Sequence, residues 1–140
     1  MKLKVKRLND KAVLPAYSKQ GDAAVDLVSC ECAVLKPMEK KVISTGISMA
    51  IPEGHAGFVW DRSGIAAKES VHTMAGVVDS GYRGEIKVVM INLGKEDFRI
   101  EEGMRIAQMA IQPVASPIIE ESDSLDDTDR AHNGFGSTGK

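Results

Sequence analysis

Short β-prone runs recur along this chain and constrain its fold more than any other feature. They lie at residues 3–5, 25–28, 42–45, 47–51, 56–60, 86–91 and 106–111, and Gly46 breaks the third from the fourth. A helical pattern is confined to residues 65–69, one or two turns. Many short strands at close spacing favour a sandwich or barrel. We therefore predict an all-β fold with one short helix.

The hydrophobic pattern ends well before the C-terminus. The chain has 140 residues, which suits a single domain. Residues 120–130 hold six acids and one base, and residues 131–140 are glycine-rich with Phe135 as their single large apolar residue. Such a tail cannot offset its ordering entropy by burial. We predict a core domain at 1–119 and an acidic linker with a flexible arm at 120–140. A plain disordered terminus is the alternative.

Charge and cysteine content limit the partners. The net charge of −2 does not suit a polyanion, so we expect no nucleic-acid partner. No stretch approaches the roughly 20 apolar residues of a membrane span, and the N-terminus has no secretory h-region. Cys30 and Cys32, at i and i+2 on an extended strand, lie too far apart along it to bridge easily, which favours reduced thiols in a cytoplasmic protein.

The segment 61–68 combines groups that suit an anionic oxygen. Arg62 offers a guanidinium, Ser63 a hydroxyl, and the predicted helix start offers backbone N–H groups. The alternative is an ordinary helix start capped by Ser63 or Asp61.

The segment 75–85 has three glycines around Asp79 and Tyr82, between two β-prone stretches. This pattern indicates a hairpin, and its glycines allow a flat ligand to approach the backbone. Asp79 is then a candidate base and Tyr82 a candidate flat wall. The alternative is a hairpin with Asp79 in the turn and Tyr82 as packing.

Two further segments offer polar groups. Gln108 follows a turn at 103–105 and could point into a site, although an ordinary strand is the alternative. Residues 134–140 match the start of a Walker A pattern, but the helix that this motif needs does not follow. A glycine-rich nest for phosphate, with Arg130 on a phosphate and Phe135 on a base, is the functional reading that remains. None of the three histidines has a partner at metal-ligand spacing.

Taken in order, the segments at 23–29, 61–68, 75–86, 103–110 and 130–139 resemble the five motifs of the homotrimeric dUTPases. The resemblance implies a distorted jelly-roll fold, a homotrimer and active sites at subunit junctions. It also implies hydrolysis of dUTP to dUMP and pyrophosphate with Mg²⁺. That activity lowers the ratio of dUTP to dTTP and supplies dUMP for thymidylate synthesis.

The resemblance also assigns roles to individual residues. Asp79 matches the general base, Tyr82 the ring beneath the deoxyribose, and Asp26 the carboxylate that holds Mg²⁺ through water. The positions that read uracil are Thr73, Gly76, Val77, Val78 and Lys87. The positions that contact phosphate are Arg62, Ser63, Gly64 and Gln108. The arm that closes over the nucleotide carries Arg130, Phe135, Gly136 and Ser137.

The chain departs from the family's pattern at several positions. Ala24 stands where a glycine is usual, Gly81 and Met104 each replace a common Asp, and residues 131–133 replace a more glycine-rich stretch. Asp61 replaces a proline, and its charge competes with phosphate for Arg62. We expect these changes to affect the rate and arm closure, not the reaction.

Two other functions fit part of the pattern. A dCTP deaminase shares this fold and an Asp-x-Gly-aromatic hairpin like residues 79–82, but its glutamate would fall near Val89, which cannot relay protons. A non-catalytic nucleotide sensor would use the same residues to bind dUTP and signal through the ordered arm. Retention of Asp79 argues against a purely binding role.

Overall fold

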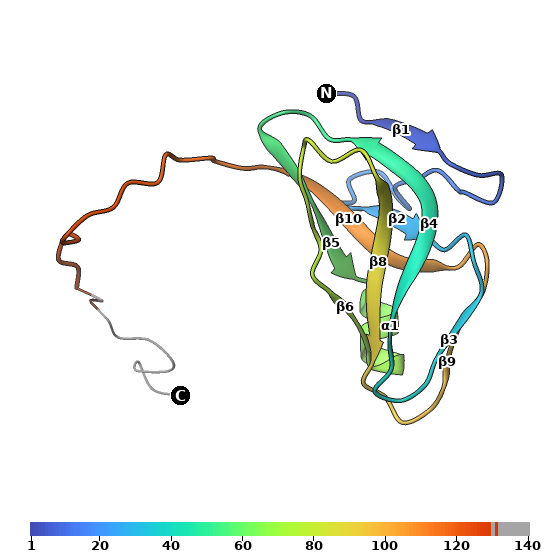
Figure 1. The fold of residues 1–140 in the computed structure, drawn as a ribbon. Helices are drawn as coiled ribbons and strands as arrows, with labels where there is room; N and C mark the ends of the chain where they lie inside the picture. Colours follow the sequence, from blue (N-terminus) through green and yellow to red (C-terminus); the bar gives the residue numbers. More distant parts are fainter. Residues whose placement is uncertain (130, 132–140) are drawn as a thin grey trace.

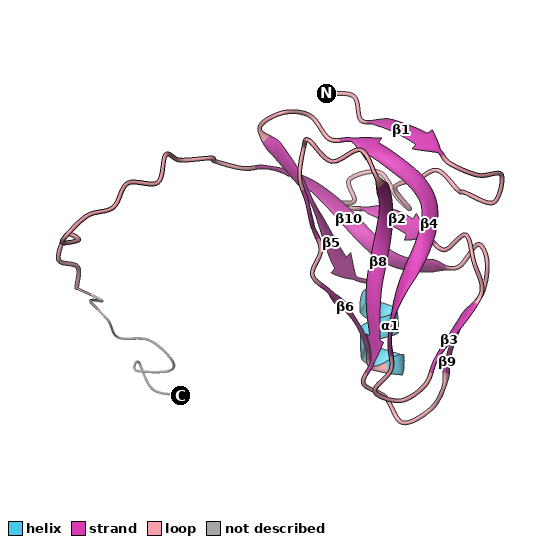
Figure 2. Ribbon diagram, viewed as in Figure 1, coloured by secondary structure: helices cyan, strands magenta, loops and turns pink. Residues whose placement is uncertain are grey.

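The computed structural model describes residues 1–129 and 131 and consists of two four-stranded sheets, a two-stranded sheet and one helix (Figures 1 and 2). The first sheet has the order β1 (Lys4–Arg7), β4 (Lys40–Ala50), β8 (Glu85–Asn92), β6 (Val71–Met74). The second has the order β2 (Val25–Val28), β10 (Arg105–Pro113), β5 (His55–Asp61), β7 (Val77–Val78). The small sheet pairs β3 (Ala33–Leu35) with β9 (Phe98–Ile100), and the helix is α1 (Ser63–Glu69).

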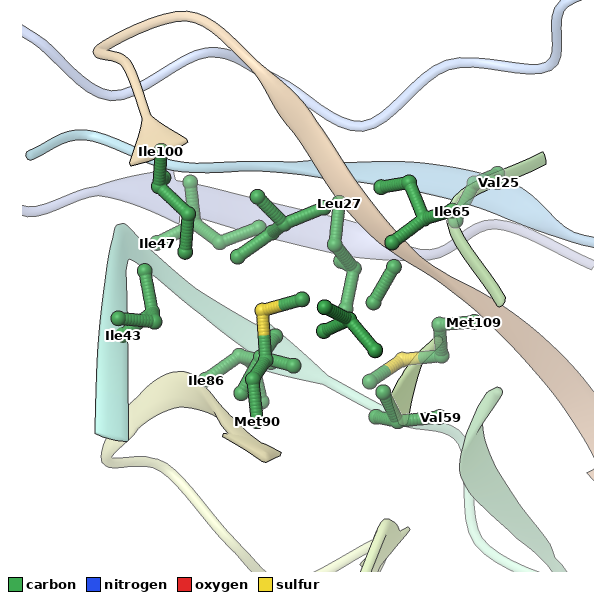
Figure 3. Close-up of a cluster of buried hydrophobic side chains, with 14 of the residues drawn as sticks. Val25, Leu27, Ile43, Ile47, Val59, Ile65, Ile86, Met90, Ile100 and Met109 are labelled. Atoms are coloured by element: carbon green, nitrogen blue, oxygen red, sulfur yellow. The ribbon is translucent and has the colours of Figure 1, made fainter. Parts of the chain in front are cut away.

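The core lies between the two larger sheets (Figure 3). Along β8, Ile86, Val88 and Met90 are buried and alternate with more exposed residues, as expected for a strand with one face on a core. Leu27 from β2 and Met109 from β10 enter the same cluster from the second sheet. All strand pairs are antiparallel, and the all-β prediction is confirmed.

The predicted break at Gly46 is wrong, because residues 40–50 form one strand with an irregularity. The register of β4 against β8 shifts between Ser44 and Ser48, and Gly46 there has a φ of 68°. The carboxylate of Glu85 accepts the Gly46 N–H at 2.9 Å, and that of Glu31 accepts the Ser44 N–H at 2.7 Å. Side chains thus replace the missing ladder bonds, so the strand continues through the bulge.

The helix is longer than predicted, and four short strands have no counterpart among the predicted runs. α1 starts two residues before the predicted 65–69 and ends at Glu69, followed by the C-cap residue Ser70, whose φ is 55°. The strands β3, β6, β7 and β9 have only two to four residues each, too few for a periodic pattern to be distinctive.

Beyond β10, residues 114–129 contain no helix or strand and lead away from the sheets (Figure 1). Ile118 and Ile119 are almost fully exposed on this stretch, at 96% and 95%. The predicted division at residue 119 stays a prediction. No helix within the described residues is long and apolar enough to cross a membrane.

Candidate active site

The loop that follows β7 folds into a turn beside a cavity of about 270 Å³. The Tyr82 N–H donates to the Asp79 carbonyl oxygen at 3.1 Å. Arg83 closes the turn, because its Nη1 donates to the carbonyl oxygens of Ser80 at 2.6 Å and Tyr82 at 2.8 Å. Asp79 and Tyr82 both line the cavity, and both side chains are exposed to solvent there.

The ring of Tyr82 is held in place by the chain that follows it. Its hydroxyl donates to the Glu85 carbonyl oxygen at 3.0 Å. A Cβ on Gly84 would collide with the hydroxyl and ring atoms of Tyr82, so a side chain at position 84 would have to displace the ring. Since the Glu85 side chain also binds Gly46, the ring is linked to the bulge of β4.

The strands on either side of the segment 75–85, β6 and β8, pair antiparallel, as the predicted hairpin requires, but the short β7 inside the segment pairs elsewhere. Within the described residues β7 pairs with β5, whereas β8 pairs with β4 and β6. Both edges of β8 are therefore occupied, and β7 takes the open edge of β5 in the other sheet. The strands β7 and β8 therefore belong to different sheets, and residues of both line the cavity.

Most of the predicted nucleoside residues lie around this one cavity. Those that line it are Gly76, Val77, Val78, Asp79, Tyr82 and Lys87. Thr73 is not among them, because it points inward from β6 and is only 6% exposed. Its hydroxyl and its N–H both donate to the carboxylate of Asp61, each at 2.6 Å.

A second, more polar pocket of about 300 Å³ forms where β2, β10 and the start of α1 meet. Gln108 of β10 stands opposite Asp26 of β2 in the ladder, which places both at this pocket. Arg62 is the N-cap residue of α1. The lining residues are Ser18, Asp22, Ala23, Ala24, Asp26, Arg62, Ser63, Gly64 and Gln108. All four predicted phosphate contacts and the predicted metal residue thus meet here.

Asp26 is the centre of a charged network at this pocket. One carboxylate oxygen accepts Arg62 Nε at 3.0 Å, and the other accepts Ser18 Oγ at 2.8 Å and Arg105 Nη1 at 3.2 Å. Burial by itself raises the pKa of the Asp26 carboxyl, but the Ser18 hydrogen bond and the two arginines outweigh it and hold that pKa below its ordinary value.

A family model described as dUTPase matches residues 10–139. The chain belongs to the dUTPase family. It is 50% identical over 141 residues to the deoxyuridine 5'-triphosphate nucleotidohydrolase of Clostridium kluyveri, with 99% of each chain covered.

Solved dUTPase structures have the same fold. A variant of the dUTPase of Staphylococcus bacteriophage 80alpha with dUpNHpp matches with a TM-score of 0.95, 30% identity and 99% of each chain covered. A variant of the dUTPase from phage phi11 of S. aureus, described as coordinating a structural Mg(II) ion, matches with a TM-score of 0.86 and 27% identity. That match covers 91% of this chain and 100% of the phage chain.

The metal expected for a dUTPase would find few ligands on this chain alone. Within residues 1–129 and 131, no group of three or more His, Cys, Asp or Glu side chains could hold an ion. Asp26 offers oxygen atoms of the kind that Mg²⁺ prefers, but both already accept hydrogen bonds. These residues fit an ion that is carried by a triphosphate and reaches Asp26 through water.

Asp61, a departure from the dUTPase pattern, does not compete for Arg62. Its carboxylate is taken up by Thr73 and by His72, whose Nδ1 lies 2.7 Å from it. Arg62 instead binds Asp26. The expected competition with phosphate is therefore wrong, because both charged side chains have other partners.

The structure also places at this pocket and its charged network three residues that were not predicted from the sequence. Ser18, Asp22 and Arg105 border the charged network, although only Arg105 lies in a recognised motif. Ser18 and Asp22 precede the first motif, and no periodicity or motif signal marks them. The predicted arm residues Arg130, Phe135, Gly136 and Ser137 lie outside the described residues.

The depressed pKa of Asp26 predicts how acid affects this chain. The folded-state pKa lies below the unfolded value of about 4, so the network's stabilisation is complete above that pH and is lost as pH falls through the folded pKa. We expect the free energy of unfolding to fall on acidification in this window, and less so in Asp26→Asn. Urea unfolding at a series of pH values measures both. The matched variant Asp97→Asn, at an exposed position away from the network, should keep the full acid loss, and an unchanged slope in Asp26→Asn would contradict the assignment.

Proposed function

We propose that this chain hydrolyses dUTP to dUMP and pyrophosphate. The observation that carries the proposal is the cavity that has Asp79 and Tyr82 on one tightly bonded turn. Membership of the dUTPase family supports it, as does the name of the Clostridium kluyveri relative. The separate pocket around Arg62 supplies cationic and neutral donors for a triphosphate.

The nucleoside cavity accounts for the choice of base and sugar. Backbone groups at 76–78 have a fixed order of donors and acceptors, so cytosine would leave buried groups unpaired at a cost of about 1–3 kcal/mol each. Tyr82, fixed through its hydroxyl, packs against the sugar and leaves no room for a 2′-hydroxyl. The close fit of the segment 75–87 around the base would exclude the methyl group of thymine.

Asp79 performs the chemical step. Its carboxylate orients a water and takes its proton as the water oxygen attacks the α-phosphorus in line. The bond from the α-phosphorus to the bridging oxygen breaks, and pyrophosphate leaves with that electron pair. A well-placed general base contributes about 10²–10⁴-fold, so positioning and charge neutralisation must supply the rest.

The phosphate pocket supplies that positioning. Arg62, Ser63, Gly64 and Gln108 bind the phosphate oxygens, and we propose that Asp26 holds Mg²⁺ through water. Mg²⁺ bound to a triphosphate neutralises its charge and keeps several waters. Because the charge of Asp26 is already balanced by Arg62 and Arg105, an indirect contact suits it better than direct ligation.

A homotrimer with sites at subunit junctions is part of the proposal. Among the described residues, the nucleoside cavity and the phosphate pocket have no lining residue in common. Trp60 and Val77 border a third cavity and are 58% and 67% exposed, which is unusual for large apolar side chains of strands. A second copy of the chain that covers this face would bury them and could bring the two kinds of pocket together.

The C-terminal residues complete the proposed site. The family resemblance assigns Arg130, Phe135, Gly136 and Ser137 to the arm that closes over the nucleotide, with Arg130 on a phosphate and Phe135 on the base. Stacking of Phe135 on the base contributes about 1–3 kcal/mol. The activity would lower the ratio of dUTP to dTTP and supply dUMP for thymidylate synthesis. We also propose a cytoplasmic location, since Cys30 and the exposed Cys32 are both free thiols.

One assay with four nucleotides tests the function. We expect pyrophosphate release from dUTP with Mg²⁺, and a kcat/KM for dCTP, UTP and dTTP that is lower by at least about tenfold each. Similar values for all four would defeat the selectivity argument. Ammonia release from dCTP would indicate a deaminase, although Val89 lines the nucleoside cavity where that enzyme needs its glutamate. Binding of dUTP without turnover would indicate a sensor.

A further inference from the structure

The carboxylate of Asp61 joins strands from the two main sheets. Asp61 ends β5, whereas His72 and Thr73 lie in β6 of the other sheet. One carboxylate oxygen accepts the Thr73 N–H and the Thr73 hydroxyl, each at 2.6 Å, and the other accepts His72 Nδ1 at 2.7 Å. Thr73 is buried, so its two donors are directed at this carboxylate and not at solvent.

These hydrogen bonds connect the two ends of the segment 62–70, which contains α1 and the proposed phosphate-binding residues 62–64. The segment that connects β5 to β6 contains α1. Asp61, at the end of β5, is hydrogen-bonded to Thr73 in β6 and so holds the two ends of this segment together. The turn at residues 62–64 follows Asp61 directly. In addition, Gln108 of β10 donates its Nε2–H to the Asp61 carbonyl oxygen at 2.8 Å.

The helix fixes this turn mainly through one side chain, Ile65, which is buried in the core. α1 has seven residues, no side-chain hydrogen bond at its N-cap and no acidic residue in its first turn. Helices this short are marginal without support from their surroundings. The position of the turn therefore also depends on bonds at its ends: Arg62 binds Asp26, and Asp61 makes three bonds to β6.

We propose that Asp61 is a positioning residue for the triphosphate: by binding Thr73 and His72 it fixes the 62–64 turn, and through its carbonyl oxygen it orients Gln108. The inference rests on the proposed function. Asp61 does not touch the substrate and does not take part in the chemical step. The pKa of its carboxyl agrees with this arrangement, since burial raises it but the His72 and Thr73 hydrogen bonds bring it below its ordinary value.

The geometry predicts a selective loss when these bonds are removed. The turn at 62–64 faces the phosphate pocket, and the nucleoside cavity has none of its residues. A displaced turn should weaken binding of the triphosphate equally in the ground state and in the transition state. Such a loss raises KM and leaves kcat nearly unchanged.

The test compares two ligands and three variants of the full-length chain. Asp61→Ala should bind dUpNHpp about tenfold more weakly by calorimetry, with a similar rise in KM for dUTP, while kcat changes by less than about threefold. The inhibition constant of deoxyuridine, which has no phosphate, should stay within about twofold. Asp61→Asn keeps an oxygen for the Thr73 donors and should recover most of the affinity. Asp97→Ala removes an exposed carboxylate elsewhere and should leave the affinity for both ligands unchanged.

Other results would overturn the inference. Equal weakening of both ligands in Asp61→Ala would show a general structural role. Full affinity for dUpNHpp in a folded Asp61→Ala would show that the turn does not depend on these bonds. If Asp61→Ala does not fold, Asp61→Asn combined with His72→Ala carries the same comparison. Absence of dUTP turnover by the unmodified chain would defeat the proposed function instead, and the ratio of the two binding constants would still report on the turn.

Discussion

Replacing Asp79 with Asn should abolish dUTP turnover and leave the affinity for the nucleotide almost unchanged. Asn has the same shape, so the turn closed by Arg83 and Tyr82 should persist. It cannot take a proton from water, and loss of a general base costs about 10²–10⁴-fold in rate. The readouts are kcat by pyrophosphate release and the dissociation constant of dUpNHpp by calorimetry.

Ser80→Ala is a suitable control for this experiment. Ser80 lies next to Asp79 and contributes its carbonyl oxygen to Arg83, a contact that alanine retains. It should therefore turn over dUTP at a rate close to that of the unmodified chain. Near-normal kcat in Asp79→Asn would refute the role of Asp79 as base. A large loss of dUpNHpp affinity in that variant would mean that the carboxylate binds the nucleotide as well.

Deletion of residues 130–140 should leave a folded chain that has lost most of its activity. The core between the two sheets is built from residues 12–109, none of which the deletion removes. Stacking of Phe135 is expected to contribute about 1–3 kcal/mol, and each 1.4 kcal/mol corresponds to a factor of ten. With the Arg130 contact also lost, kcat/KM should fall by at least about 100-fold.

Three measurements separate the outcomes of the deletion. Circular dichroism and thermal unfolding report on the fold, and sedimentation reports on whether the oligomer has the same subunit number as the full chain. Phe135→Ala alone should give a smaller loss of kcat/KM, within the range expected for stacking. If the truncated chain fails to fold, the C-terminal residues are structural. Full activity after deletion would show that they do not close over the nucleotide.

Strands with a clear alternation could be predicted from the sequence. In β8 the buried residues recur every second position over eight residues, and both β8 and β10 lie where the pattern predicts them, although β10 buries neighbouring residues at 106–107 and 109–110. The continuity of β4 could not be predicted, because it depends on the side chains of Glu31 and Glu85 reaching the bulge from distant segments. The pairing of β7 with β5 depends on which edges remain open in three dimensions.

In the candidate site, too, local features could be predicted from the sequence, whereas contacts between distant segments could not. The motif residues around Asp79 and those around Arg62 each lie at one pocket, because each motif is a local segment whose backbone turn is set by its own glycines and polar residues. Thr73 was assigned to uracil by its place in the order of residues, but strand alternation turns it inward to Asp61. Ser18 and Arg105 were missed because their contact with Asp26 arises only when β2 and β10 pair.

The separation of the two pockets also predicts how inactive alleles behave when they are expressed together. In the proposed trimer, a subunit with a defective nucleoside turn still lends an intact phosphate pocket to its neighbour, and the reverse holds for a subunit with a defective Arg62 turn. Two alleles that are each inactive alone can therefore complement one another in a mixed assembly. A subunit damaged in the common core would lend nothing, so complementation would distinguish lesions in one half-site from lesions in the fold.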